Sequence, residues 1–333
     1  MTRPGRRARE RNPPPSGEIP GHRPPPEAGP QDGGARITAG ERAGAETPRG
    51  GRVERGTPSE LLLPDGRDLA WSEWGPQDGR PVLFCPGAGM SGVLGFGTDV
   101  LSERGLRLLA LDRPGLGRSS ADPGKTYGSW AADVGHLVDA LGLRRVLGVG
   151  FSQGAPFAVA LAGAGLLDAV ALVAGQDDLR AQRHLLVPDV AGMLDAADAD
   201  PAGFEREIAR VAGADWLWQV ILTTAAPVDR VRYESTDLGP AVRAALDDGF
   251  RQGAAGYARD LVTALGPWPV RPEDLTVPVH LWYGAQDTST VHSPDLGRTL
   301  ADRIPGARHT VLDDEGGALL WTRARDVLDA LAA

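Results

Sequence analysis

One short stretch of the sequence has the residue types and spacing of a serine nucleophile: Gly150-Phe151-Ser152-Gln153-Gly154. A β-like run precedes it and a helix of small residues follows, which puts Ser152 on a strand-to-helix turn. Such a sharp turn brings the residues two before and two after the serine into close contact, so both favour glycine. The helix that begins near Gln153 would direct its backbone N–H groups, starting with that of Gln153, at a developing oxyanion.

The elements around this turn predict an α/β fold. From residue 61 onwards short β-like runs alternate with helical segments, and strands separated by helices favour a mostly parallel sheet with helices on both faces. Residues 61–75 predict two strands around a Pro-Asp-Gly turn, which would form an antiparallel edge. The alternation stops between about residues 178 and 272, where the pattern is helical. A helical insertion at this place would lie over the strand ends, where the sites of α/β proteins form.

Three more motifs accompany the serine in a fixed order: "VLFCPGAG" (82–89), "LDRPGLGRSS" (111–120) and "YGAQDTSTV" (283–291). With the serine motif between the second and third, residues 60–333 resemble the α/β-hydrolase superfamily. The resemblance implies a mostly parallel, eight-stranded type of sheet with a helical lid inserted after the sixth strand. The core would comprise residues 57–177 and 273–333, and the lid residues 178–272.

The resemblance also implies roles for individual residues. Asp287 matches the acid of the family's catalytic triad, and Gly87 matches the glycine of its first oxyanion loop. Ala88 would then supply a second N–H donor beside that of Gln153.

The chain departs from the family at the catalytic base. Where the family has a Gly-His pair before its last helix, this sequence has Gly316 and Gly317. A serine hydroxyl is a poor nucleophile at neutral pH without an adjacent base. Two histidines remain as candidates for a replacement: His292, five residues after Asp287, and His184 in the predicted lid. The other four histidines are placed less suitably: His22, His136, His280 and His309.

Three functions are compatible with these residues. The first is a hydrolase that cleaves an ester-like small molecule through Ser152 with an incomplete triad. The second is a cofactor-free enzyme of another class, such as a lyase or cyclase, in which the oxyanion donors polarise a carbonyl group. The third is an inactive member that only binds a ligand, because a fold does not determine a function.

Composition limits the partners and the compartment. The net charge of −9 argues against nucleic acid, the single cysteine rules out an intramolecular disulfide, and no metal-ligand cluster or cofactor motif occurs. Residues 146–167 lack charge but contain five glycines and a proline, so we expect no membrane span. Residues 1–56 form an Arg/Pro/Gly-rich segment with no apolar signal-peptide core; we expect a disordered tail and a cytoplasmic protein. The lid composition suggests a small apolar substrate, whereas the oligomeric state leaves no trace in the sequence.

Overall fold

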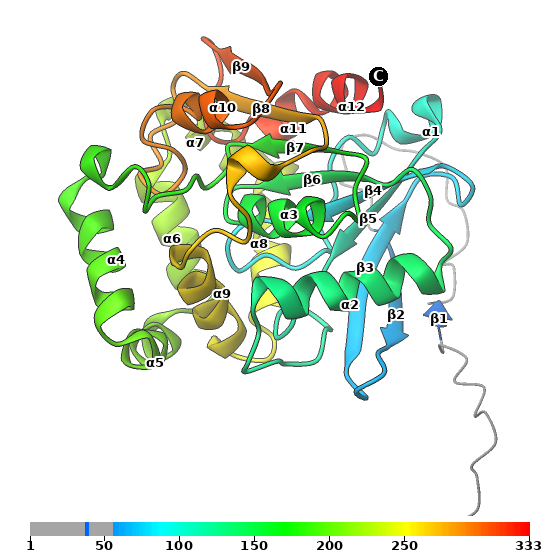
Figure 1. Ribbon diagram of the computed structural model, residues 1–333, viewed down its shortest axis with the longest axis horizontal. Helices are drawn as coiled ribbons and strands as arrows, with labels where there is room; N and C mark the ends of the chain where they lie inside the picture. The colour runs from blue at the N-terminus through cyan, green and yellow to red at the C-terminus, as the bar shows by residue number, and fades with distance from the viewer. Residues whose placement is uncertain (1–36, 40–55) are drawn as a thin grey trace, which may run out of the picture. The chain divides into compact units, whose positions relative to one another are not determined.

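The computed structural model describes residues 37–39 and 56–333, and a nine-stranded sheet runs through them (Figure 1). Across the sheet the strand order is β1-β2-β3-β5-β4-β6-β7-β8-β9. From β5 to β9 in this order, every pair of neighbouring strands is parallel. The pairs β1–β2, β2–β3 and β3–β5 are antiparallel. The strands are β1 (Ile37–Ala39), β2 (Thr57–Leu62), β3 (Asp68–Trp74), β4 (Arg80–Cys85), β5 (Leu106–Leu111), β6 (Leu147–Phe151), β7 (Ala169–Val173), β8 (Val279–Gly284) and β9 (Arg308–Leu312). The predicted α/β class and antiparallel edge are therefore confirmed.

Helices cover both faces of the sheet, and each face has its own apolar core. One core packs α2, α3 and α10 against the strands, with Trp130 and Phe157 among its largest buried side chains. The opposite core packs α1, α11 and α12, and includes Phe84 and Leu328. These helices are α1 (Leu101–Arg104), α2 (Tyr127–Ala140), α3 (Gly154–Gly163), α10 (Arg298–Arg303), α11 (Leu319–Thr322) and α12 (Ala324–Ala332). Burial on both faces explains why β6 and β7 are continuous apolar runs.

Between β7 and β8 the chain forms a helical insertion with no strand, as the sequence pattern predicts. Prolines occupy the first turn of several of its helices, where the missing N–H costs nothing and the fixed φ suits a helix. The elements are η1 (Arg183–Leu185), α4 (Pro188–Ala199), α5 (Pro201–Val211), α6 (Ala214–Thr224), α7 (Pro227–Tyr233), α8 (Leu238–Gly249), α9 (Ala255–Leu265) and η2 (Pro272–Asp274). The exact domain boundaries at residues 178 and 272 stay a prediction.

The predicted tail, residues 1–56, needs one correction. Residues 37–39 form β1, which pairs antiparallel with residues 59–61 of β2 and adds a ninth strand to the eight of the predicted type of sheet. A strand can attach to a sheet edge through backbone hydrogen bonds alone, so the scarcity of apolar side chains did not reveal it. Residues 1–36 and 40–55 of the predicted tail lie outside the described residues.

The parallel strands bring the chemically interesting loops to one edge of the sheet. Cys85 at the end of β4 pairs with Gly150 of β6, and Phe151 at the end of β6 pairs with Val173 of β7. Val173 in turn pairs with β8, two residues before that strand ends. The loops that follow β4, β6, β7 and β8 therefore begin side by side, at the carboxyl edge where α/β sites form.

Candidate active site

Ser152 lies on a tight turn between β6 and α3 and adopts a left-handed backbone conformation, with φ of +50°. Such a conformation is strained for a residue other than glycine and is common at functional turns. The flanking glycines are required by space. A β-carbon at Gly154 would lie 2.0 Å from the carbonyl oxygen of Cys85, and one at Gly150 would lie 2.6 Å from the backbone of α3. The spacing of the sequence motif thus has a steric cause.

Two backbone N–H groups at the cavity, those of Gln153 and Ala88, have no partner among the described residues. Gln153 is the N-cap residue of α3, and Ala88 follows β4 in the adjacent loop and lines the cavity. Neither N–H donates a hydrogen bond to any residue in the described part of the chain. Free N–H groups at a helix start carry partial positive charge, which suits an anionic oxygen.

The loop that carries Ala88 is fastened by a buried arginine. Arg113 donates to the carbonyl oxygens of Pro86 (2.5 Å) and Gly87 (2.9 Å), and its Nε donates to Asp260 of α9 (2.7 Å). Lys125 also pairs with Asp260, and all three charged side chains are fully buried. The geometry of this loop therefore depends on a charge cluster that links it to the helical insertion.

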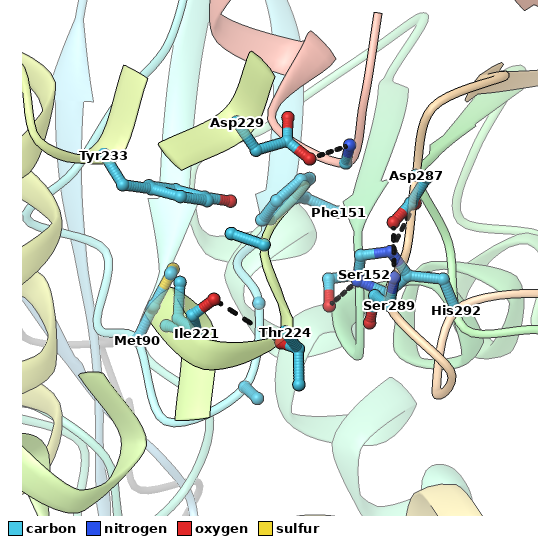
Figure 2. Close-up of a pocket in the computed structure, with 14 residues that line it drawn as sticks. Met90, Phe151, Ser152, Ile221, Thr224, Asp229, Tyr233, Asp287, Ser289 and His292 are labelled. Atoms are coloured by element: carbon cyan, nitrogen blue, oxygen red, sulfur yellow. Dashed lines mark hydrogen bonds and ion pairs between the residues drawn. The ribbon is translucent and has the colours of Figure 1, made fainter. Parts of the chain in front are cut away.

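The predicted acid and one of the two predicted bases meet at Ser152. His292 Nε2 lies 2.9 Å from Ser152 Oγ, and His292 Nδ1 lies 2.6 Å from Asp287 Oδ2 (Figure 2). Asp287 Oδ1 accepts the N–H of Ser289 at 2.9 Å, which fixes the carboxylate. Because a carboxylate only accepts, Nδ1 carries the proton of the neutral ring and Nε2 is free to accept from the serine. The arrangement is that of an acid, a base and a nucleophile in series.

Asp177, which follows β7, holds the segment that carries His292. Its N–H donates to the carbonyl oxygen of His292 (2.8 Å), and its Oδ2 accepts from Ser293 Oγ (2.7 Å). The side chain of Gln182 also donates to this oxygen (2.6 Å). Burial raises the pKa of Asp177 to about 6 in spite of these donors. The base is thus positioned by a segment far from it in sequence.

At Gly317, the position of the family's usual histidine, the structure has another partner. Asp229 of α7 accepts the N–H groups of Gly317 (2.8 Å) and Ala318 (2.9 Å) through its two oxygens. A β-carbon at position 317 would lie 3.0 Å from Asp287 Oδ1, so this position faces the same acid that His292 uses. Burial raises the pKa of Asp229, and the charge of Asp287 adds to the shift. Nothing in the local sequence marked Asp229, because its role depends on a contact across 88 residues.

The structure does not bring His184, the second candidate base, to the serine. It lies exposed on η1 and is not among the residues that line the cavity. His280 is buried in β8, where burial lowers its pKa, and His309 donates from Nε2 to the carbonyl oxygen of Leu296 (2.7 Å). The segment of residues 183–185 points its exposed side chains to solvent, which the helical pattern of the sequence did not indicate.

A single cavity surrounds the three residues and has mixed walls. Ser152, His292 and Asp287 occupy one side, and the helical insertion contributes residues of α6 and α7 on the other (Figure 2). The lining residues are Gly87, Ala88, Met90, Phe151, Ser152, Ile221, Thr224, Ala225, Asp229, Tyr233, Asp287, Ser289, His292 and Gly317. Within residues 37–39 and 56–333 no group of three or more His, Cys, Asp or Glu side chains is arranged to hold a metal ion. No described helix is both long enough and apolar enough to cross a membrane.

Comparison with known proteins identifies the family. The model of the alpha/beta hydrolase fold family matches residues 80–324, which is most of the chain, and the protein belongs to this family. The matched range includes strands β4 to β9 together with Ser152, Asp287 and His292.

Among characterised relatives, a non-heme chloroperoxidase from Streptomyces lividans is 31% identical over 147 residues, 43% of this chain and 49% of its own. A zearalenone hydrolase from Cladophialophora bantiana is 26% identical over 254 residues, 74% of this chain and 86% of its own. The chain thus spans about half the length of the chloroperoxidases it matches.

Solved structures agree on the fold. The enol-lactonase from Burkholderia xenovorans LB400 superimposes with a TM-score of 0.60 at 24% identity, covering 81% of this chain and 98% of its own. An esterase from Exiguobacterium antarcticum gives a TM-score of 0.57 at 16% identity over 82% and 97% of the two chains. At these identities the likeness concerns the fold alone.

Proposed function

We propose that the protein is a serine hydrolase that cleaves carboxylic esters of small, largely apolar molecules, with Ser152, His292 and Asp287 as its triad. The observation that carries this proposal is the 2.9 Å contact between His292 Nε2 and Ser152 Oγ, with Asp287 on the other ring nitrogen. The hydrolase name of the Cladophialophora bantiana relative, whose match covers 74% of this chain, supports hydrolytic chemistry.

In this mechanism His292 removes the proton of Ser152 as the serine oxygen attacks the acyl carbon of the ester. The N–H groups of Gln153 and Ala88 bind the oxyanion that forms, and Asp287 stabilises the imidazolium. When the tetrahedral intermediate collapses, the alcohol leaves with the proton from His292 and the acyl group stays on Ser152. A water molecule, deprotonated by His292, then releases the carboxylic acid and regenerates the serine.

The two other functions considered from the sequence, a non-hydrolytic cofactor-free enzyme and an inactive ligand-binding member, rest on the absence of a base at position 317. The position of His292 weakens that argument, because it offers a base from a different loop. The helical insertion acts in this proposal as a lid, since its helices α6 and α7 contribute walls of the cavity.

The test is labelling of the purified protein with a fluorophosphonate, an electrophile that reacts rapidly with activated serines. We expect rapid adduct formation that mass spectrometry maps to Ser152 and that Ser152→Ala abolishes. His292→Ala should slow labelling at least about 10³-fold, because loss of the base from a triad typically costs 10⁴ to 10⁶ in turnover.

His184→Ala is the matched control, because this exposed histidine was the other candidate base, and its labelling rate should equal that of the wild type. Absence of an adduct in the folded wild-type protein would exclude the serine-hydrolase mechanism. Equal labelling of His292→Ala and the wild type would exclude His292 as the base.

A further inference from the structure

Asp229 is a buried carboxylate inside the cavity that the proposed mechanism does not use. It is 4% exposed and lines the cavity, and each of its oxygens accepts one backbone N–H, from Gly317 and Ala318. Each carboxylate oxygen has two lone-pair sites, so half of its accepting capacity remains. No arginine or lysine of the described residues pairs with it. The free capacity faces a site that a bound molecule can enter.

Tyr233 lies one helical turn after Asp229 on the same face of α7. The residue is 8% exposed and also lines the cavity, and its hydroxyl makes no hydrogen bond within the described part of the chain. Trp218 packs edge-on against its ring, with centroids 6.3 Å apart. Figure 2 shows the ring extending from α7 with its hydroxyl foremost into the cavity. A nine-tenths buried phenol held in this way is a donor and acceptor without a partner.

Thr224 of α6 also lines this wall, but its hydroxyl donates to the carbonyl oxygen of Val220 in its own helix (2.9 Å). The other side chains of the wall are apolar: Ala88, Met90, Phe151, Ile221 and Ala225. On this wall, Asp229 and Tyr233 of α7 are therefore the polar groups that remain available to a bound molecule. They are separate from Ser152, His292 and Asp287. A carboxylate acceptor beside a hydroxyl recognises a hydrogen-bond donor. A free carboxylate on the ligand would meet both Asp229 and Asp287, and their charges would repel it.

We propose that Asp229 and Tyr233 form a polar subsite that binds a hydrogen-bond donor group of the substrate, a hydroxyl or an ammonium. The substrate class is thus an ester with an apolar body and one donor group, in place of a purely apolar ester. This inference rests on the proposed serine-hydrolase function, because the donor group must be carried by the molecule whose acyl carbon reaches Ser152.

The experiment compares kcat/KM for matched esters by titration of the released acid. Methyl 3-hydroxybutyrate and methyl 3-aminobutyrate are compared with methyl butyrate, and 2-hydroxyethyl butyrate with propyl butyrate, so that donors on either side of the ester are tested. We expect the wild type to prefer at least one donor-bearing ester over its partner by about tenfold or more. A larger preference for the amino ester would assign an ammonium, and a larger one for a hydroxy ester would assign a hydroxyl.

Asp229→Asn and Tyr233→Phe should each reduce that ratio by about tenfold. The first removes the negative charge and one of the two acceptor oxygens, and the second removes the phenol hydroxyl. Tyr233→Phe leaves the bonds to Gly317 and Ala318 intact, so it tests the subsite even if Asp229→Asn is unstable. The controls are Asp200→Asn, an exposed carboxylate that accepts the N–H of Gly203, and Tyr257→Phe, a buried tyrosine away from the cavity.

Two results would overturn the proposal. One is a wild type with no preference for any donor-bearing ester. The other is that both variants lose kcat/KM equally on esters with and without the donor group. Failure of the hydrolase function itself looks different. In that case the wild type neither hydrolyses methyl butyrate nor forms a fluorophosphonate adduct, whereas failure of the subsite alone leaves both reactions in place.

Discussion

Two regions of the site, the turn of Ser152 (the nucleophile side) and the segments around His292 (the base side), are built in different ways. On the nucleophile side, Ser152 and its flanking glycines come from one continuous stretch, and their spacing follows from the contacts of a single turn. On the base side, Asp287 and His292 share one loop, but Asp177 comes from the loop after β7 and Asp229 from the helical insertion. One side is thus determined by local geometry and the other by contacts across long stretches of chain.

This difference indicates which catalytic residue can change its position in the sequence and which cannot. The turn at Ser152 tolerates few substitutions, because its glycines touch backbone atoms. The base needs only to reach Ser152 Oγ and the acid together, and His292 does so from a position five residues after Asp287. Position 317 faces the same acid from the opposite loop, which explains how one carboxylate can serve either placement.

The largest expected effect lies on the base side. Asp287→Asn should lower kcat for ester hydrolysis by about 10⁴-fold, the size seen when the acid of a serine protease triad is replaced in the same way. The asparagine amide would donate to His292 Nδ1, so that Nε2 would carry the proton and could no longer accept from Ser152. Steady-state kinetics on methyl butyrate measures the loss.

Asp313→Asn, an exposed carboxyl outside the cavity, is the matched control and should leave kcat unchanged. Circular dichroism would confirm that both variants are folded. A loss of less than tenfold in folded Asp287→Asn would mean that the tautomer of His292 is not set by this carboxylate.

The same difference explains what the sequence could predict. The serine turn, the position of Asp287 and the alternation of strands and helices are local patterns, and the fold followed from them. His292 was one of two candidates, because sequence spacing does not show which histidine reaches the end of β6. The roles of Asp229 and Asp177 could not be predicted, since each depends on a contact between segments more than 50 residues apart in the chain. Tyr233 could not be predicted either, because only the fold places α7 at the wall of the cavity. Strand β1 was missed because edge pairing needs no apolar pattern.

The next largest effect concerns the turn of Ser152 and is measured as protein stability. Gly154→Ala should lower the free energy of unfolding by about 3 kcal/mol or more, because its β-carbon would lie 2.0 Å from a backbone oxygen of Cys85 that cannot move away easily. Gly192→Ala in α4 is the matched control, since no atom lies within 4 Å of its β-carbon. Alanine there should stabilise the protein by about 0.5–1 kcal/mol. Urea unfolding measures both.

If Gly154→Ala were as stable as the wild type, the turn would have relaxed, and the steric explanation of the motif would be wrong. The fluorophosphonate reaction then gives a second measure. A relaxed turn moves Ser152 away from His292, so labelling should slow even if the protein keeps its stability.

The smallest effect concerns the carboxyl that holds the segment of His292. Burial raises the pKa of Asp177 to about 6, from about 4 in an unfolded chain, so the native state retains this proton while the unfolded state loses it. Stability from the protonated group is full below about pH 4 and is lost as pH rises through about 6. Asp177→Asn lacks this titrating group and therefore this loss. As the pH rises from 4 to 7, the free energy of unfolding of the variant should increase by about 2 kcal/mol relative to that of the wild type.

The exposed Asp198 provides a control whose stability changes with pH in the opposite direction. Asp198 accepts hydrogen bonds from Arg180, which lower its pKa, so its contribution to stability appears as pH rises instead of disappearing. Asp198→Asn should therefore shift the pH dependence slightly in the other direction. Urea unfolding at pH 4, 5, 6 and 7 compares the three proteins.

If Asp177→Asn and the wild type lose stability in parallel, the Asp177 carboxyl is ionised in the native protein. Ser293 and Gln182 would then solvate it fully, and the segment of His292 would be held equally at every pH in this range.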